Sequence, residues 1–178
     1  MLRITSLDKK QTMVRAVCIN LVIFSISFAG CHGKRVPPLS SDLRMSDKKS
    51  AKQLIAGFYD LEQNQWRWTA RRFAVVLQPP AGSERTGAVL QLKVFMPESQ
   101  IQKLGPMTLS ADVGEVSLAP ETFTKGGSFS YCRNIPPKLI SPNLLPVVFR
   151  FDKALTPFEV DGRELAVVVL EVSLQQKN

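Results

Sequence analysis

Apolar and polar side chains alternate with a period of two along most of the chain after residue 66. Segments 87–95, 106–113 and 145–151 each place an apolar residue at nearly every second position. This alternation is typical of half-buried β-strands, because successive side chains of a strand point to opposite faces of the sheet. Segment 164–174 is apolar on both faces at its start, which predicts a central or covered strand.

The same pattern predicts the fold class of residues 54–178. Turn residues separate the alternating segments, and no stretch shows the period of a long amphipathic helix. We therefore expect an all-β domain, an antiparallel β-sandwich of jelly-roll type with about eight strands. The expected strands are 66–77, 87–95, 98–104, 106–113, 115–119, 128–133, 145–151 and 164–174.

The N-terminal segment 1–30 has the features of a signal peptide. Residues 1–15 are polar and basic, and residues 16–30 form an apolar run. Fifteen helical residues rise only about 22 Å, which is shorter than a membrane-spanning helix. Residues 31–53 are rich in charges and serines, with two prolines, and predict a flexible basic tether.

The apolar run ends in Ser27-Phe-Ala-Gly-Cys31, which resembles the lipobox of bacterial lipoproteins, with Phe28 where that family usually has an aliphatic residue. The resemblance implies that Cys31 is acylated and that the membrane lipid is a partner of the protein. The alternatives for this segment are an uncleaved membrane anchor and plain secretion. It also implies a cell-envelope location. Because His32 and not Asp follows the cysteine, the outer membrane is favoured if the cell has one.

The positive charge of the chain lies mostly before the predicted domain. The net charge is +8, but residues 53–178 carry 13 basic and 12 acidic side chains. A nearly neutral domain is a poor match for a phosphate backbone, so we expect no nucleic-acid partner. A basic tether suits a segment close to an anionic membrane surface.

Histidine and cysteine usage argues against most catalytic and metal sites in the domain. His32 is the single histidine of the chain, so a Ser-His-Asp triad or an imidazole metal site after residue 32 is excluded. Cys18 and Cys31 precede the domain, and Cys132 is expected to be a buried or half-buried side chain rather than a nucleophile. We expect no metal, no cofactor and no catalytic residue.

Both tryptophans break the alternation of the first expected strand. Trp66 and Trp68 occupy even positions, whereas Phe73, Val75 and Leu77 occupy odd ones. Either a bulge lies near residues 70–72, or the tryptophans lie on the opposite face of the sheet from Phe73. The indoles are then either part of the core or an aromatic platform on which sugar rings could stack.

Three segments together resemble a β-sandwich module found beside glycosyltransferases and methyltransferases of bacterial surface-polysaccharide machinery. They are Gly57-Phe-Tyr-Asp-Leu-Glu62, Trp66-Arg-Trp-Thr69 and Asp161-Gly-Arg-Glu-Leu165, with Ala166 where the module has Gly. The resemblance covers about residues 55–175 and implies an accessory or binding module. It supplies no established site residues.

The residue types in these segments give five candidate ligand-binding side chains and two readings of them. The candidates are Glu62, Trp66, Arg67, Trp68 and Arg163. One reading is structural, with an Arg163–Glu62 pair that joins the first and last strands. The other is a polar cleft that binds sugar hydroxyls.

The function expected from the sequence is that of a membrane-anchored envelope lipoprotein whose sandwich is a non-catalytic module for a carbohydrate or glycoconjugate. The alternative is a protein-interaction or assembly lipoprotein without a small ligand, recognisable by buried tryptophans and an exposed apolar patch or sheet edge. A hydrolase is the least favoured reading, because it requires two carboxylates that converge in a cleft.

Overall fold

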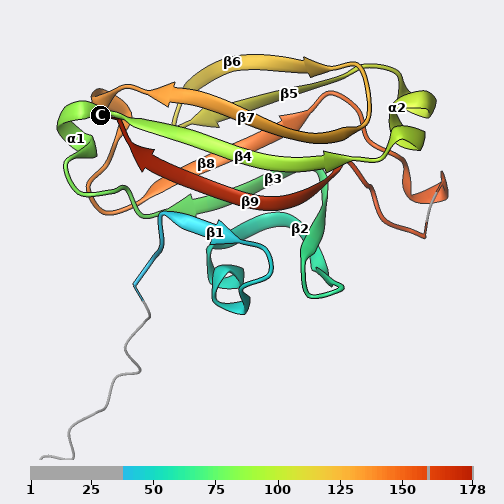
Figure 1. The fold of residues 1–178 in the computed structure, drawn as a ribbon, viewed down its shortest axis with the longest axis horizontal. Helices are drawn as coiled ribbons and strands as arrows, with labels where there is room; N and C mark the ends of the chain where they lie inside the picture. The colour runs from blue at the N-terminus through green and yellow to red at the C-terminus, as the bar shows by residue number, and fades with distance from the viewer. Residues whose placement is uncertain (1–37, 160, 178) are drawn as a thin grey trace, which may run out of the picture. The chain divides into compact units, whose positions relative to one another are not determined.

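The computed structural model describes residues 38–159 and 161–177, and Figure 1 shows their arrangement. Nine antiparallel strands within these residues form one strongly bent sheet in the order β6-β5-β8-β3-β9-β4-β7, with β1 paired to β9 and β2 paired to β3. The expected all-β, sandwich-like fold is therefore confirmed. The strands are β1 Asp42–Arg44, β2 Leu54–Glu62, β3 Trp66–Leu77, β4 Ala88–Met96, β5 Met107–Val113, β6 Val116–Phe123, β7 Gly127–Ile135, β8 Leu145–Phe151 and β9 Val167–Gln176.

Short helical segments connect some of the strands. They are the α-helices α1 Ser83–Thr86 and α2 Glu98–Leu104, and the 3-10 turns η1 Lys48–Gln53, η2 Pro137–Leu139 and η3 Pro157–Glu159. In Figure 1, α1 and α2 lie at opposite ends of the sheet.

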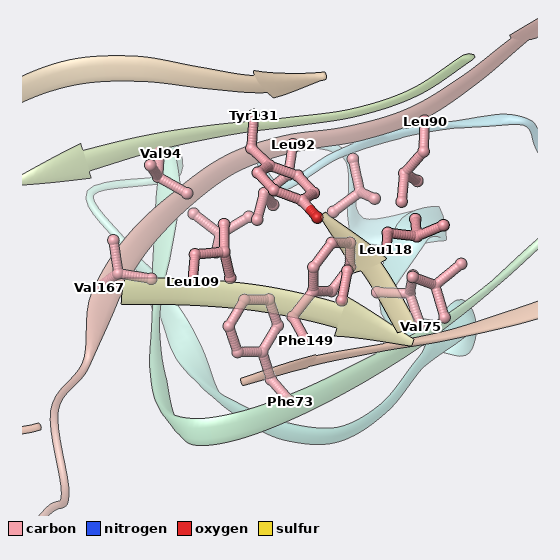
Figure 2. Packing of buried hydrophobic residues seen from close by; sticks show 14 of the residues in the cluster. Phe73, Val75, Leu90, Leu92, Val94, Leu109, Leu118, Tyr131, Phe149 and Val167 are labelled. Carbon is pink, nitrogen blue, oxygen red and sulfur yellow. The ribbon is translucent and has the colours of Figure 1, made fainter. Parts of the chain in front are cut away.

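The core lies between the two halves of the bent sheet. Tyr131 and Leu92 enter it from β7 and β4, and Phe73 and Phe149 enter it from β3 and β8 (Figure 2). The rings of Phe73 and Phe149 stack with centroids 5.1 Å apart. All four side chains are fully buried, as the alternation of polar and apolar residues predicts.

The two end strands of the sheet, β6 and β7, are joined by side chains. The Tyr131 hydroxyl donates to the Ala119 carbonyl at 2.9 Å. Arg133 donates from Nε to the same carbonyl at 2.6 Å and from Nη2 to the Pro120 carbonyl at 3.0 Å, and it contacts Glu121 at 3.1 Å. These bonds nearly close the sheet on itself and satisfy two carbonyl groups at the edge of β6.

β9 is the central strand that the apolar sequence of segment 164–174 predicts. It pairs with β4 along most of its length, with β3 at Val167–Val169, and with β1 at Glu171–Ser173. The register against β4 shifts between Lys93 and Val94, which leaves Leu170 as an extra residue on β9. β3 also divides its pairing, with β9 at residues 67–69 and with β8 at residues 72–77.

One expected strand and the expected burial of one cysteine differ from the structure. Residues 98–104, expected as a strand, form helix α2, because Pro97 is followed by Glu98 and the apolar residues Ile101 and Leu104 have helical spacing. Cys132, expected to be buried or half-buried, is exposed, because it lies on the outer face of β7 next to the buried Tyr131.

The predicted tether, residues 31–53, differs from the structure over its second half. Strand β1 and turn η1 both lie in this range, and Leu43 and Met45 are fully buried. Gln53 fastens the segment by donating from Nε2 to the carbonyls of Ser40 and Val76, at 2.9 and 2.7 Å. Two isolated apolar residues in a charged segment give too weak a period for sequence analysis to detect.

The predicted signal segment 1–30, Cys31 and His32 lie outside the described residues. Among residues 38–159 and 161–177, no helix is both long enough and apolar enough to cross a membrane.

Candidate functional site

A groove of about 390 Å³ lies on the outer face of the sheet, where both tryptophans of the chain are found. Its volume is within the roughly 300–1,000 Å³ of typical small-molecule sites. The lining is mainly apolar and comes from five strands and two connecting loops. The lining residues are Glu62, Gln65, Trp66, Trp68, Phe95, Pro97, Ser128, Val168 and Leu170.

The strand register explains why these residues meet. Trp68 is the cross-strand partner of Val168, Val168 that of Phe95, and Phe95 that of Ser128. These four residues form one row across β3, β9, β4 and β7, and directly paired residues point to the same face of a sheet. The row therefore presents an indole, a valine and a phenylalanine side by side on the outer face.

A second row carries the polar end of the groove. Glu62 is the cross-strand partner of Trp66, at the turn between β2 and β3. Gln63 and Asn64 in this turn adopt positive φ values of 49° and 56°, which allow the tight reversal that sets the two strands in register. The carboxylate of Glu62 therefore stands next to the indole of Trp66.

Both tryptophans are half-buried, whereas Phe73 and Val75 on the same strand are fully buried in the core. Of the two explanations for the broken alternation, the structure shows that the tryptophans lie on the face opposite to Phe73. The pairing of β3 with β2 is also irregular at this place, where the partner of Ala56 is Ala74 and that of Phe58 is Thr69. Neither indole belongs to the central core.

Arg163 holds Glu62 from outside the groove. Its Nη1 donates to Glu62 Oε1 at 2.9 Å, and its Nε and Nη2 donate to the Asp161 carboxylate at 2.6 to 3.0 Å. The guanidinium also lies 5.3 Å from the ring centre of Tyr59. The Arg163–Glu62 pair expected from the sequence is confirmed, and it joins residues 101 positions apart.

These contacts shift the ionisation of two groups beside the groove. Hydrogen bonds from Arg163 lower the pKa of Asp161 below its usual value. The hydrogen bonds to Asp161, followed by that to Glu62, raise the pKa of Arg163. At neutral pH the cluster is one cation between two carboxylates.

Of the five residues predicted from the sequence, Glu62, Trp66 and Trp68 line the groove. Arg163 contacts Glu62 without being a lining residue, and Arg67 donates to the Tyr59 carbonyl at 2.8 Å on the opposite face of β3. Sequence reasoning missed the other six lining residues, Gln65, Phe95, Pro97, Ser128, Val168 and Leu170. An apolar residue at a polar position of an alternating strand, as Phe95 is after Lys93, was the one available signal.

The groove has the lining of a binding site. It combines aromatic and aliphatic surface with three polar side chains at its margins, those of Glu62, Gln65 and Ser128. Glu62 is the one carboxylate among the described lining residues. Within residues 38–159 and 161–177, no group of three or more His, Cys, Asp or Glu side chains is placed to hold a metal ion.

No protein-family model matches this chain, and no curated protein matches it. Among solved structures, the chain is similar to a carbohydrate-binding module, CBM36, in complex with calcium and xylotriose. The TM-score is 0.36 and the identity 14%, over 58% of this chain and 72% of the module.

Proposed function

We propose that this domain is a non-catalytic carbohydrate-binding module of a lipid-anchored envelope protein. The observation that carries the proposal is the position of Trp66, Trp68 and Phe95 on the outer face of the sheet, in one groove. Large aromatic side chains usually become buried, so three of them on one outer surface need an explanation beyond stability.

Saccharides match the chemistry of this groove. The faces of a pyranose ring carry C–H groups, which pack against indole and phenyl rings, while the hydroxyl groups at the ring edge need hydrogen-bond partners. Glu62, Gln65 and Ser128 provide acceptors and donors at the margins of the aromatic surface. Apolar faces with polar edges are therefore complementary to the lining.

The proposal concerns binding and not hydrolysis. Glycoside hydrolysis usually requires two carboxyl groups placed about 5–10 Å apart on either side of the scissile bond. Glu62 is the one described lining carboxylate, and its Oε1 is engaged by Arg163. Asp161, the next carboxylate in this cluster, is likewise held by Arg163.

The anchoring part of the proposal rests on the sequence Ser27-Phe-Ala-Gly-Cys31. An acylated Cys31 would hold the domain at a membrane, since two or three acyl chains bind far more firmly than one. Replacing Cys31 by Ala should abolish labelling with a radioactive or clickable fatty acid and release the protein from the membrane fraction. Labelling that persists in Cys31→Ala would contradict the anchor.

Tryptophan fluorescence tests the binding site directly, because both tryptophans of the chain line the groove. In the purified full chain we expect acrylamide to quench the emission, and a bound glycan to shift the emission and shield it from the quencher. Trp68→Ala should weaken glycan binding about 5- to 150-fold, which corresponds to a loss of about 1–3 kcal/mol, as for a nucleobase stacked on an aromatic side chain.

Phe158→Ala is the matched control, since this aromatic residue is fully exposed and is not a lining residue of the groove. It should leave glycan binding unchanged. A full chain whose emission is indifferent to every glycan on an envelope-polysaccharide panel would count against the proposal and favour the protein-partner alternative.

A further inference from the structure

The charges around the groove point to the class of saccharide that it accepts. Glu62 is the one charged side chain among the described lining residues, so the charge nearest to a ligand is negative. A second carboxylate, that of Asp161, lies within the same Arg163 cluster. Two carboxylates and one guanidinium leave a net charge of −1 beside the groove.

Arg163 is the basic group closest to Glu62, and it is already occupied. All three guanidinium nitrogen atoms donate to carboxylates, Nη1 to Glu62 and the other two to Asp161. Recognition of an acidic sugar by arginine usually uses a parallel pair of these N–H groups. The Asp161 carboxylate takes the Nε and Nη2 pair, so a ligand carboxylate would have to displace it.

Lys93 and Arg67, two of the basic residues near the groove, are also engaged. Lys93 lies two positions before Phe95 on β4 and pairs with Glu171, with Nζ 3.0 Å from Oε1. Arg67 lies between the two tryptophans in sequence, but it donates to the Tyr59 carbonyl from the other face of β3. Neither side chain is a lining residue of the groove.

We infer that the groove selects uncharged or amine-bearing saccharides and rejects acidic ones; this inference rests on the proposed function. A uronic acid at the aromatic surface would bring its carboxylate towards Glu62, and none of the described lining residues is a cation that could compensate it. Like charges in contact disfavour a partner strongly. A hydroxyl group can donate to the free acceptor sites of Glu62, and an ammonium group can also form an ion pair with it.

The test compares three hexasaccharides with the same β-1,4 linkage: cellohexaose, the glucosamine hexamer and the glucuronic acid hexamer. Binding to the purified full chain is measured by calorimetry at low and high salt. We expect the glucuronic acid hexamer to bind at least about tenfold more weakly than cellohexaose, with a difference that shrinks at high salt because screening weakens the repulsion. The glucosamine hexamer should bind at least as well as cellohexaose at low salt.

Glu62→Gln tests whether the negative charge of Glu62 causes the weaker binding of the acidic hexamer. This variant removes the negative charge that repels the uronate, while its amide oxygen can still accept from Arg163, so binding of the glucuronic acid hexamer should increase about tenfold or more. Glu84→Gln makes the same charge change on α1, at the end of the sheet opposite to α2 and the groove residue Pro97 (Figure 1). It should leave all three affinities unchanged.

The outcomes separate the inference from the proposed function. Binding of the glucuronic acid hexamer as tight as that of cellohexaose, or no change of the ratio in Glu62→Gln, would overturn the charge selectivity while the binding module stands. If none of the three hexamers binds and no glycan of the envelope-polysaccharide panel changes the tryptophan emission, the proposed function fails and the inference falls with it.

Discussion

The Tyr131 hydroxyl donates a hydrogen bond to the Ala119 carbonyl at 2.9 Å and so joins β7 to β6, the two ends of the strand order. The ring of Tyr131 is fully buried, and the guanidinium of Arg133 lies 4.1 Å from its centre. Burial, as the largest cause, raises the pKa of this phenol. Tyr131 therefore packs in the core and also joins the two end strands of the sheet.

Tyr131→Phe keeps the buried ring and removes this hydrogen bond. We expect the free energy of unfolding to fall by about 1 kcal/mol, the usual net contribution of one hydrogen bond. Urea titration followed by circular dichroism measures it. Tyr59→Phe, at the half-buried tyrosine beside Arg163, is the matched control. Equal stability of Tyr131→Phe and the parent protein would show that the contact between β6 and β7 does not depend on the hydroxyl group.

Gly57 is required where β2 passes close to β3. Its φ is +74°, and a Cβ at this position would collide with the Arg72 carbonyl oxygen and lie 2.8 Å from Phe73 Cα. Gly57→Ala should therefore lower the free energy of unfolding by more than about 3 kcal/mol, the upper range for one strained backbone residue.

Gly114 is the control that distinguishes the cost of backbone strain from the cost of a steric collision. It also has a positive φ, +60°, but a Cβ there would meet nothing within 4 Å. Gly114→Ala should cost only about 1–2 kcal/mol, the strain of a left-handed conformation. Similar melting curves for the two alanine variants would argue against the close approach of β2 and β3 at Gly57.

Gln100 on α2 fastens the start of the last strand. It is 2% exposed, and its Nε2 donates to the carbonyls of Leu165 and Ala166 at 2.9 and 2.7 Å. Gln100→Leu should lower the free energy of unfolding by about 1–3 kcal/mol, because two carbonyls in a dry environment lose their partner. Gln102→Leu on the exposed side of the same helix should change it little, and an equal loss in both variants would contradict this role.

Glu159 provides a test that depends on pH. The backbone N–H of Thr156, then Lys103 and the Thr156 hydroxyl, lower the pKa of Glu159 from 4.5 to about 2. Because the folded pKa is depressed, the stability that the carboxylate contributes is present above pH 4.5 and is lost as the pH falls through about 2.

Carbon-13 NMR of the Glu159 carboxyl group measures this titration. Lys103→Met should move the midpoint upwards, towards 4.5, but leave it below that value because the Thr156 bonds remain. A midpoint near 4.5 in the parent protein would show that the Thr156–Glu159 turn does not form in solution.

The strands that sequence analysis located best are those with one buried face. β3 and β8 have the predicted bounds, 66–77 and 145–151. The core residues of β8 alternate strictly with solvent-facing ones, and those of β3 alternate from Phe73 onwards. β2 was missed, since its register shifts at three places along β3 and no period survives such shifts. β1 is three residues long, too short to show a period.

The site was predictable only within one part of the chain. Glu62, Trp66 and Trp68 are close in sequence, and their residue types indicated a shared surface. Phe95, Ser128 and Val168 join them through pairings between β3, β9, β4 and β7, which depend on the strand order. A sequence with several similar strands does not specify that order. The lining residues on β4, β7 and β9 therefore could not be predicted.

The central place of β9 also sets the order of events when the domain folds. Its partners β1, β3 and β4 are all made earlier, and each of these ladders has to wait until residues 167–176 leave the ribosome. Such long-range pairings fold slowly, in milliseconds to seconds. In a chain exported as we propose, the signal segment would be available to the translocation machinery while residues 167–176 are still being made, before the ladders of β9 can form.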